Sequence, residues 1–208
     1  MPADGFRAPI ELRGRHVELL PLLREHRQAL LFAARDPEVG RFLRTQPGTT
    51  LARIDGLIGQ WLEGFARGTV LPFSLRVPGG PVIGMTNYLR IERANRAVEI
   101  GGTWLDSTFW RTPVNTEAKY LLLRHAFEDE QFHRVQLQTD SRNVRSQRAI
   151  ARIGGVHEAA LREDVLLSGP YWRTSEMFSL LAPEWPSAKA RLESMLARLW
   201  VGPERGPA

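Results

Sequence analysis

Hydrophobic residues recur along this chain with two different periods, and segments of each kind are interleaved. The segment 133–140 alternates strictly, with Val135, Leu137 and Thr139 on one face, which predicts a strand. The segment 50–66 carries apolar residues at helical spacing, which predicts an amphipathic helix. Because segments of both kinds alternate from one end to the other, the sequence predicts one α+β domain with a shared core.

The expected elements follow the order β-αα-βββ-α-β-α-ββ-α. Strands are expected at 16–20, 71–77, 82–91, 97–105, 133–140, 157–167 and 172–181. Helices are expected at 26–39, 50–66, 116–129, 143–153 and 184–199. We expect a single domain over residues 1–208, with flexible ends at about 1–10 and 202–208.

Composition excludes several kinds of chemistry. The chain has no cysteine, so it has no disulfide, no thiolate metal site and no cysteine nucleophile. Its five histidines show no metal-ligand spacing, and we expect no metal. No stretch approaches the roughly 20 apolar residues of a membrane span, and Met1 to Arg13 lacks the apolar run of a signal peptide. These features predict a soluble, cytoplasmic protein that makes no membrane contact.

The net charge of +5 comes almost entirely from arginine. A basic balance is compatible with nucleic-acid binding. The arginines, however, usually alternate with acids, as in Leu23-Arg24-Glu25, which favours a solvated surface of mixed charge, so we expect no direct nucleic-acid contact. One basic group stands out on the fourth predicted helix: Arg142, Arg145, Arg148 and Arg152. This group is either an exposed helix face or a site for phosphates.

The segment 99–158 brings two helix starts next to two strand ends. A helix start offers unpaired N–H groups and a partial positive charge, so two starts side by side suit a pyrophosphate. The loop 110–116 adds an arginine, two hydroxyls and an amide. The pattern alone is a weak signal, because most helix starts bind only water.

Residue identities strengthen this interpretation. The runs that matter are Glu99-Ile-Gly-Gly-Thr-Trp104, Asn115-Thr-Glu-Ala-Lys119, Leu121-Leu-Leu-Arg-His-Ala-Phe127, Asn143-x-x-Ser146-x-x-Ala149-Ile150-x-x-Ile153-Gly154 and Glu184-Trp-Pro186. Together they resemble the GNAT superfamily of acyl-CoA N-acyltransferases, and within it the RimJ/RimL-like branch of ribosomal-protein N-terminal acetyltransferases. The resemblance implies a GNAT-like fold, a mixed and mostly antiparallel sheet flanked by helices, with acetyl-CoA as cosubstrate.

The expected pyrophosphate loop departs from the family's Gln/Arg-x-x-Gly-x-Gly/Ala pattern. The first position of the pattern is occupied by Trp110, and the two small-residue positions are occupied by Pro113 and Asn115. Pro113 removes one N–H donor but fixes a helical φ, and Asn115 tolerates left-handed geometry better than most residues. The alternative is a rigid helix entry without a ligand. The resemblance implies cofactor contacts at Trp104, Leu105, Arg111, Thr112, Val114, Asn115, Thr116, Asn143, Ser146 and Arg148.

The resemblance also implies catalytic candidates. Many family members protonate the leaving thiolate with a tyrosine, but Ile150 stands at that position. Ser146, one turn earlier, is the expected acid, unless it only bonds the backbone of its helix. Asn143 is expected to contact the pantetheine arm or an ordered water, and it is also a favoured N-cap. Glu99 is the candidate base; the alternative is a surface or edge-strand glutamate paired with an arginine.

These features predict an N-acetyltransferase that moves acetyl from acetyl-CoA to a primary amine, by direct transfer in a ternary complex. The paired glycines Gly101 and Gly102 predict a strand bulge that supplies an N–H donor to the thioester carbonyl. The alternative is a catalytically idle CoA-binding or partner-binding module. The acceptor stays open between a small-molecule amine and a protein N-terminus, including that of a ribosomal protein, and a homodimer is possible.

Overall fold

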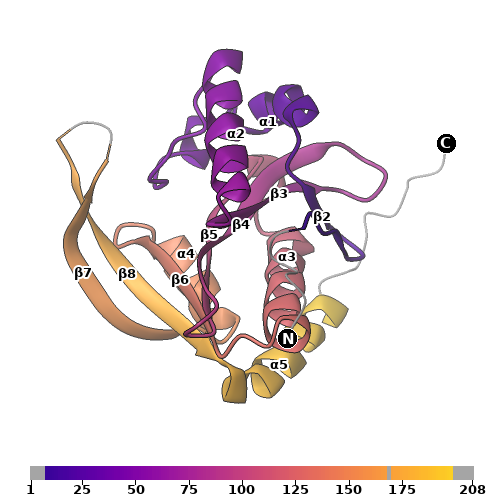
Figure 1. Cartoon of the computed structure of the whole chain (residues 1–208), viewed down its shortest axis with the longest axis vertical. Helices are drawn as coiled ribbons and strands as arrows, with labels where there is room; N and C mark the ends of the chain where they lie inside the picture. Colours follow the sequence, from indigo (N-terminus) through magenta and orange to yellow (C-terminus); the bar gives the residue numbers. More distant parts are fainter. Residues whose placement is uncertain (1–7, 168–169, 199–208) are drawn as a thin grey trace.

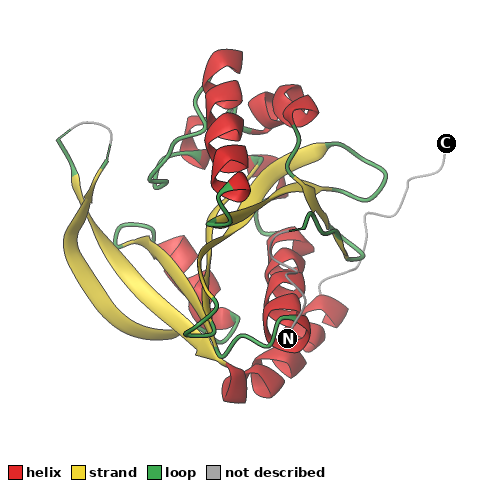
Figure 2. Ribbon diagram, in the orientation of Figure 1, coloured by secondary structure: helices red, strands yellow, loops and turns green. Residues whose placement is uncertain are grey.

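The structure, a computed structural model, describes residues 8–167 and 170–198, which form one sheet with helices on both faces (Figures 1 and 2). The strand order across the described sheet is β1-β2-β3-β4-β5-β6-β8-β7. The strands are Leu12–Arg13 (β1), Glu18–Pro21 (β2), Val70–Arg76 (β3), Val82–Glu92 (β4), Ala97–Leu105 (β5), Arg134–Asp140 (β6), Val156–Leu166 (β7) and Trp172–Leu181 (β8). The helices are Arg27–Ala33 (α1), Leu51–Ala66 (α2), Pro113–Arg124 (α3), Val144–Arg152 (α4) and Trp185–Arg198 (α5).

The predicted order of elements is confirmed, with the two-residue strand β1 added in front. The sheet is mixed and mostly antiparallel, as expected, since only β5 and β6 pair in parallel among the described strands. Of the flexible ends expected at about 1–10 and 202–208, residues 1–7 and 202–208 lie outside the described residues, and Ile10 packs against the main core. No helix of the described ranges is long and apolar enough to cross a membrane.

Alternating side chains of the central strands build a core on each face of the sheet. Tyr88 of β4 packs in the cluster that holds α3 and α5, whereas Met85 packs in the cluster that holds α1 and α2. Strand β5 also contributes to both clusters, Ile100 to the first and Trp104 to the second, because a register shift between these two residues reverses the alternation. Figure 1 shows α1 and α2 on one side of these strands and α3 and α5 on the other. The central strands are therefore fixed from both faces.

Two predicted helices have different bounds from those expected. The expected helix at 26–39 is broken, because α1 ends at Ala33 and a separate 3-10 turn follows at Pro37–Val39, where Asp36 accepts a hydrogen bond from the N–H of Glu38 at 2.9 Å. The expected helix at 116–129 begins earlier, at Pro113, since proline is well suited to a first helical position. It then ends in a π-helical turn at His125–Asp129.

Strands β5 and β6 lie side by side over only part of their length. Their pairs are Ala97 with Arg134, Val98 with Val135 and Glu99 with Gln136. Beyond these pairs β5 continues against β4, and β6 continues against β8. The two strands therefore diverge in the middle of the sheet, and the candidate site lies where they part.

Candidate active site

A cavity of about 790 Å³ opens where β5 and β6 diverge. Its wall combines β5, β6, the starts of α3 and α4, α2 and Arg173 of β8. The residues predicted from sequence that line it are Glu99, Trp104, Leu105, Arg111, Thr112, Asn115, Thr116, Asn143, Ser146 and Arg148. The side chain of Val114, the other predicted residue, is buried in the main core. Segments far apart in the sequence thus meet around one space.

One end of the cavity is cationic and lies at the start of α3. Thr112 caps this helix, with its Oγ1 3.4 Å from the N–H of Val114. The guanidinium of Arg145, from α4, stacks 3.7 Å from the centre of the Trp110 ring. Burial, with the nearby charge of Arg111, lowers the pKa of Arg145. Two arginines held together beside a helix start favour an anionic group at this end.

The start of α4 is fixed by Asn143, whose Oδ1 accepts a hydrogen bond from the N–H of Ser146 at 3.1 Å. Arg142, the first of the four arginines proposed for phosphates, is instead bound to Asp140, with its Nη2 2.9 Å from Oδ2. It also stacks 3.4 Å from the centre of the Tyr171 ring. An acid close in space therefore takes Arg142 out of the basic group, which corrects the expectation for that residue.

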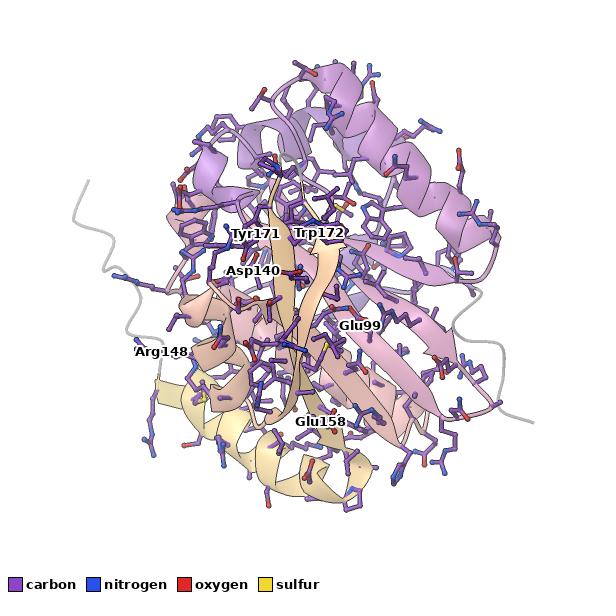
Figure 3. All side chains as sticks on the ribbon, turned by 90° about the vertical axis from the view of Figure 1, so that its left-hand side faces the viewer. Glu99, Asp140, Arg148, Glu158, Tyr171 and Trp172 are labelled. Atoms are coloured by element: carbon purple, nitrogen blue, oxygen red, sulfur yellow. The ribbon has the colours of Figure 1, made fainter. Side chains whose placement is uncertain are left out.

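Figure 3 shows how the labelled residues of this region lie around α4 and the β7–β8 hairpin. Arg148 is exposed and points outward from α4, whereas Asp140 is fully buried at the end of β6. Arg148 nevertheless lines the mouth of the cavity. Arg148 could therefore contact only the part of a bound anionic ligand that extends out of the cavity into solvent.

Glu99 is a buried carboxylate on a central strand, with only 3% of its surface exposed. The side-chain amide of Gln138 on β6 donates a hydrogen bond to its Oε1 at 2.7 Å. Its Oε2 has no hydrogen-bond partner among the described residues, although Arg90 Nε lies 3.4 Å away. Glu99 is thus not on an edge strand, although it does pair with an arginine, as the alternative expected, and its Oε2 is left without a hydrogen bond beside the cavity.

The predicted bulge in β5 is confirmed by the pairing of β4 with β5. Met85 pairs with Trp104 and Asn87 with Gly101, so the two residues between them on β5 face a single residue on β4. Gly102 has a φ of +59°, in the left-handed region that favours glycine. The bulge takes one residue of β5 out of the regular ladder beside the cavity.

A model of the acetyltransferase (GNAT) domain matches residues 16–156. The chain belongs to the GNAT acetyltransferase family. A protein of Bacillus subtilis (strain 168), "Putative ribosomal N-acetyltransferase YdaF", is 29% identical over 110 residues, which cover 53% of this chain and 59% of that protein.

Solved structures agree with this membership. The crystal structure of a "putative acetyltransferase" from T. thermophilus has a TM-score of 0.83 at 39% identity, and the match covers 91% of this chain and 98% of that one. Mycobacterium smegmatis RimJ in complex with CoA-disulfide has a TM-score of 0.77 at 22% identity, over 90% of this chain and 93% of that one. The second likeness supports the fold alone.

This GNAT domain holds a buried lysine that sequence reasoning does not single out as functional. Lys119 of α3 is 8% exposed and lines the cavity, and its Nζ donates a hydrogen bond to Thr103 Oγ1 at 2.7 Å. Thr103 Oγ1 is in turn 2.7 Å from Thr86 Oγ1. Burial lowers the pKa of Lys119 from 10.5 to about 7. One signal is present in the sequence: Lys119 and Lys189 are the only lysines in an arginine-rich chain.

A second missed residue is Arg173 of β8, which is 4% exposed and lines the cavity. No sequence signal points to it, because Arg173 sits in an alternating strand where an arginine usually faces water. Gln138, which positions Glu99, is predicted only as part of the polar face of its strand.

The bulge of the GNAT domain leads to a first testable prediction. We expect Gly102→Ala to lower the free energy of unfolding by about 1–3 kcal/mol, since a Cβ there would lie 2.6 Å from Asn87 Nδ2 and φ is left-handed. Gly56→Ala in α2 is the matched control, because its Cβ would meet nothing within 4 Å. Urea unfolding of both variants checks this. Equal stability of Gly102→Ala and the wild type would contradict the strained bulge.

Proposed function

We propose that the protein transfers the acetyl group of acetyl-CoA to a primary amine by direct attack in a ternary complex. The observation that carries the proposal is Glu99, a buried carboxylate with one oxygen left without a hydrogen-bond partner among the described residues, at the divergence of two parallel strands. An acceptor amine is mostly protonated near neutral pH and must lose a proton before it can attack. Glu99 is the group in the cavity suited to take that proton.

The cationic end of the cavity supports acetyl-CoA as the donor. The helix starts at Thr112 and Asn143 both border this end, and Arg111 and Arg145 lie beside them. A pyrophosphate brings negative charge to such a place, where backbone N–H groups and arginines stabilise it. The volume of about 790 Å³ has room for a ligand arm and a small acceptor together.

The proposed reaction balances without an enzyme-bound intermediate. The amine gives a proton to Glu99, directly or through water, and its nitrogen forms a bond to the thioester carbonyl carbon. The carbon–sulfur bond then breaks, and the thiolate takes a proton from the Ser146 hydroxyl or from water. The nitrogen loses its second proton at this stage, through water, which restores the proton given to the thiolate, and the proton held by Glu99 is released to solvent. Orientation of the two substrates and N–H donors near the Gly101–Gly102 bulge would supply most of the rate.

The proposal is tested first by binding. We expect CoA to bind with a dissociation constant between about 1 μM and 1 mM, the range of ordinary enzyme substrates. Isothermal titration measures this directly, and no heat of binding at millimolar CoA would contradict the proposal.

Turnover is tested separately by acetyl-CoA consumption over a panel of amines, amino acids and N-terminal peptides. Binding of CoA without consumption on any acceptor would identify the chain as a catalytically idle module instead.

A further inference from the structure

The acceptor end of the cavity holds a buried cation that the proposed transfer does not use. Arg173 is only 4% exposed, and its Nε has no hydrogen-bond partner within the described ranges. The side chain lines the same cavity as Glu99. Burial, with a smaller contribution from Arg44, lowers the pKa of Arg173. A guanidinium still stays charged in a protein, and a buried charge without a partner is costly.

The carboxylates that act on Arg173 electrostatically are those of Asp140, Asp164 and Glu99, and each is paired with another arginine: Arg142, Arg44 and Arg90 respectively. Asp140 is held by Arg142 through two contacts, at 3.0 and 2.9 Å. Asp164 Oδ2 lies 3.0 Å from Arg44 Nη2, which also donates to Gln138. These acids lie near enough to act on Arg173 electrostatically, but each has a closer cation. Arg173 is therefore left without an ion-pair partner of its own among the described residues.

The same cavity offers complementary groups of both signs. Glu99 Oε2, which accepts no hydrogen bond from the described residues and lies 3.4 Å from Arg90 Nε, suits an amine or ammonium, and the guanidinium of Arg173 suits a carboxylate. The indole N–H of Trp61 on α2 is a further buried donor without a partner in the described part of the chain, and Trp61 also lines the cavity. An acceptor with an amine at one end and an anion nearby would offer a partner to both Glu99 and Arg173.

Charge also excludes some acceptors. Arg44, Arg90 and Arg173 line the cavity around Glu99 and would repel a polyamine or an aminoglycoside, each of which carries several positive charges. A protein N-terminus has an amide where a free amino acid has a carboxylate, so it would leave Arg173 unpaired. Resting on the proposed acetyl transfer, we infer that the acceptor is a small amine that carries a carboxylate, as an α-amino acid does, held between Glu99 and Arg173.

The experiment compares acceptors in matched pairs that differ only at the anion. Acetyl transfer is measured for L-leucine against L-leucinamide and for L-phenylalanine against L-phenylalaninamide, with spermidine and a tripeptide amide as further arms. The wild type and Arg173→Gln are assayed at the same pH. The acid and amide acceptors have amines of different pKa, but this difference affects both enzymes equally and cancels when their acid-over-amide ratios are compared. We expect Arg173→Gln to reduce the acid-over-amide ratio of kcat/KM by about 10- to 100-fold.

The control variant is Arg162→Gln, which removes the same charge from an exposed position of β7 that does not line the cavity. It should leave the ratio unchanged. Arg173→Met provides a second test of the same loss if Arg173→Gln folds poorly.

The remaining outcomes overturn either the inferred acceptor or the proposed function. A ratio that persists in both Arg173 variants, or a wild type that prefers the amides, spermidine or the tripeptide amide, overturns the inference while leaving acetyl transfer in place. If CoA binds but no amine is acetylated, titration of L-leucine and L-phenylalanine into the CoA complex replaces the assay, and no binding at about 10 mM, far above ordinary substrate affinities, overturns it. Failure to bind CoA overturns the proposed function itself.

Discussion

We expect Glu99→Gln to lower kcat by about 10²–10⁴-fold while the affinity for CoA barely changes. Glutamine keeps the shape of the side chain but cannot accept a proton from the acceptor amine. Its carbonyl oxygen can still accept the hydrogen bond that Gln138 donates to Oε1 at 2.7 Å, so this side-chain contact between β5 and β6 should survive. The loss should therefore appear in the chemical step and not in folding or in cofactor binding.

The measurement is a pair of experiments on the same preparation: steady-state kinetics with an acceptor that the wild type acetylates, and titration with CoA. Ser146→Ala is the companion variant, and we expect a smaller loss there, since water can protonate a thiolate whose thiol has a pKa of about 8.5. Near-full kcat for Glu99→Gln at neutral pH would assign Glu99 a structural role. A large fall in CoA affinity would also contradict the assignment.

We expect Lys119→Met to raise the free energy of unfolding at neutral pH, on the order of 3–4 kcal/mol, with the gain disappearing toward about pH 10.5. Burial lowers the pKa of Lys119 from 10.5 to about 7, so keeping this amine in the core costs stability. Between these two values the unfolded chain binds a proton that the folded chain does not, and wild-type stability therefore rises with pH across the window. Below about pH 7 both states are protonated and the cost is at its largest.

Urea unfolding at about pH 6, 7, 9 and 10.5, which spans the window between the two pKa values, checks this prediction. Lys189→Met is the matched control, because Lys189 binds Glu128 at 2.8 Å and its pKa is raised by that hydrogen bond. Its stabilising effect is present below the unfolded pKa and is lost only as pH rises through the folded value, so Lys189→Met should lose stability where Lys119→Met gains it. A pH-independent difference for Lys119→Met would show that its amine is not shielded from solvent.

Local sequence patterns predict the fold well where a residue type strongly favours one kind of local structure. The bulge follows from two glycines in a strand, and the start of α4 follows from Asn143 as an N-cap. Periodicity cannot show that 26–39 is broken, because the apolar spacing continues across a segment in which Asp36 and Pro37 begin a new turn. It also misses where α3 begins, since Pro113 fits the preceding loop as well as a first helical turn.

The site is harder to predict than the fold, since its chemistry depends on tertiary neighbours. Glu99 can be found because it interrupts an apolar strand. Lys119 and Arg173 cannot be assigned from sequence, because their burial comes from strands and helices distant in sequence. The basic group that the sequence predicts around α4 loses Arg142 for a different reason, since Asp140, two residues earlier, binds it and the distant Tyr171 stacks on it.

The divergence of β5 and β6 gives this sheet an edge in its interior. Edge strands on a protein surface are a hazard, because they can pair with strands of other molecules. Here the edge begins after Glu99 on β5 and after Gln136 on β6, and the starts of α3 and α4 flank it. The unpaired backbone groups at such an edge suit a narrow, flexible chain with amide groups, which would lie along it as an added strand does. A gap of this kind would select its ligand by thickness before any side chain is involved.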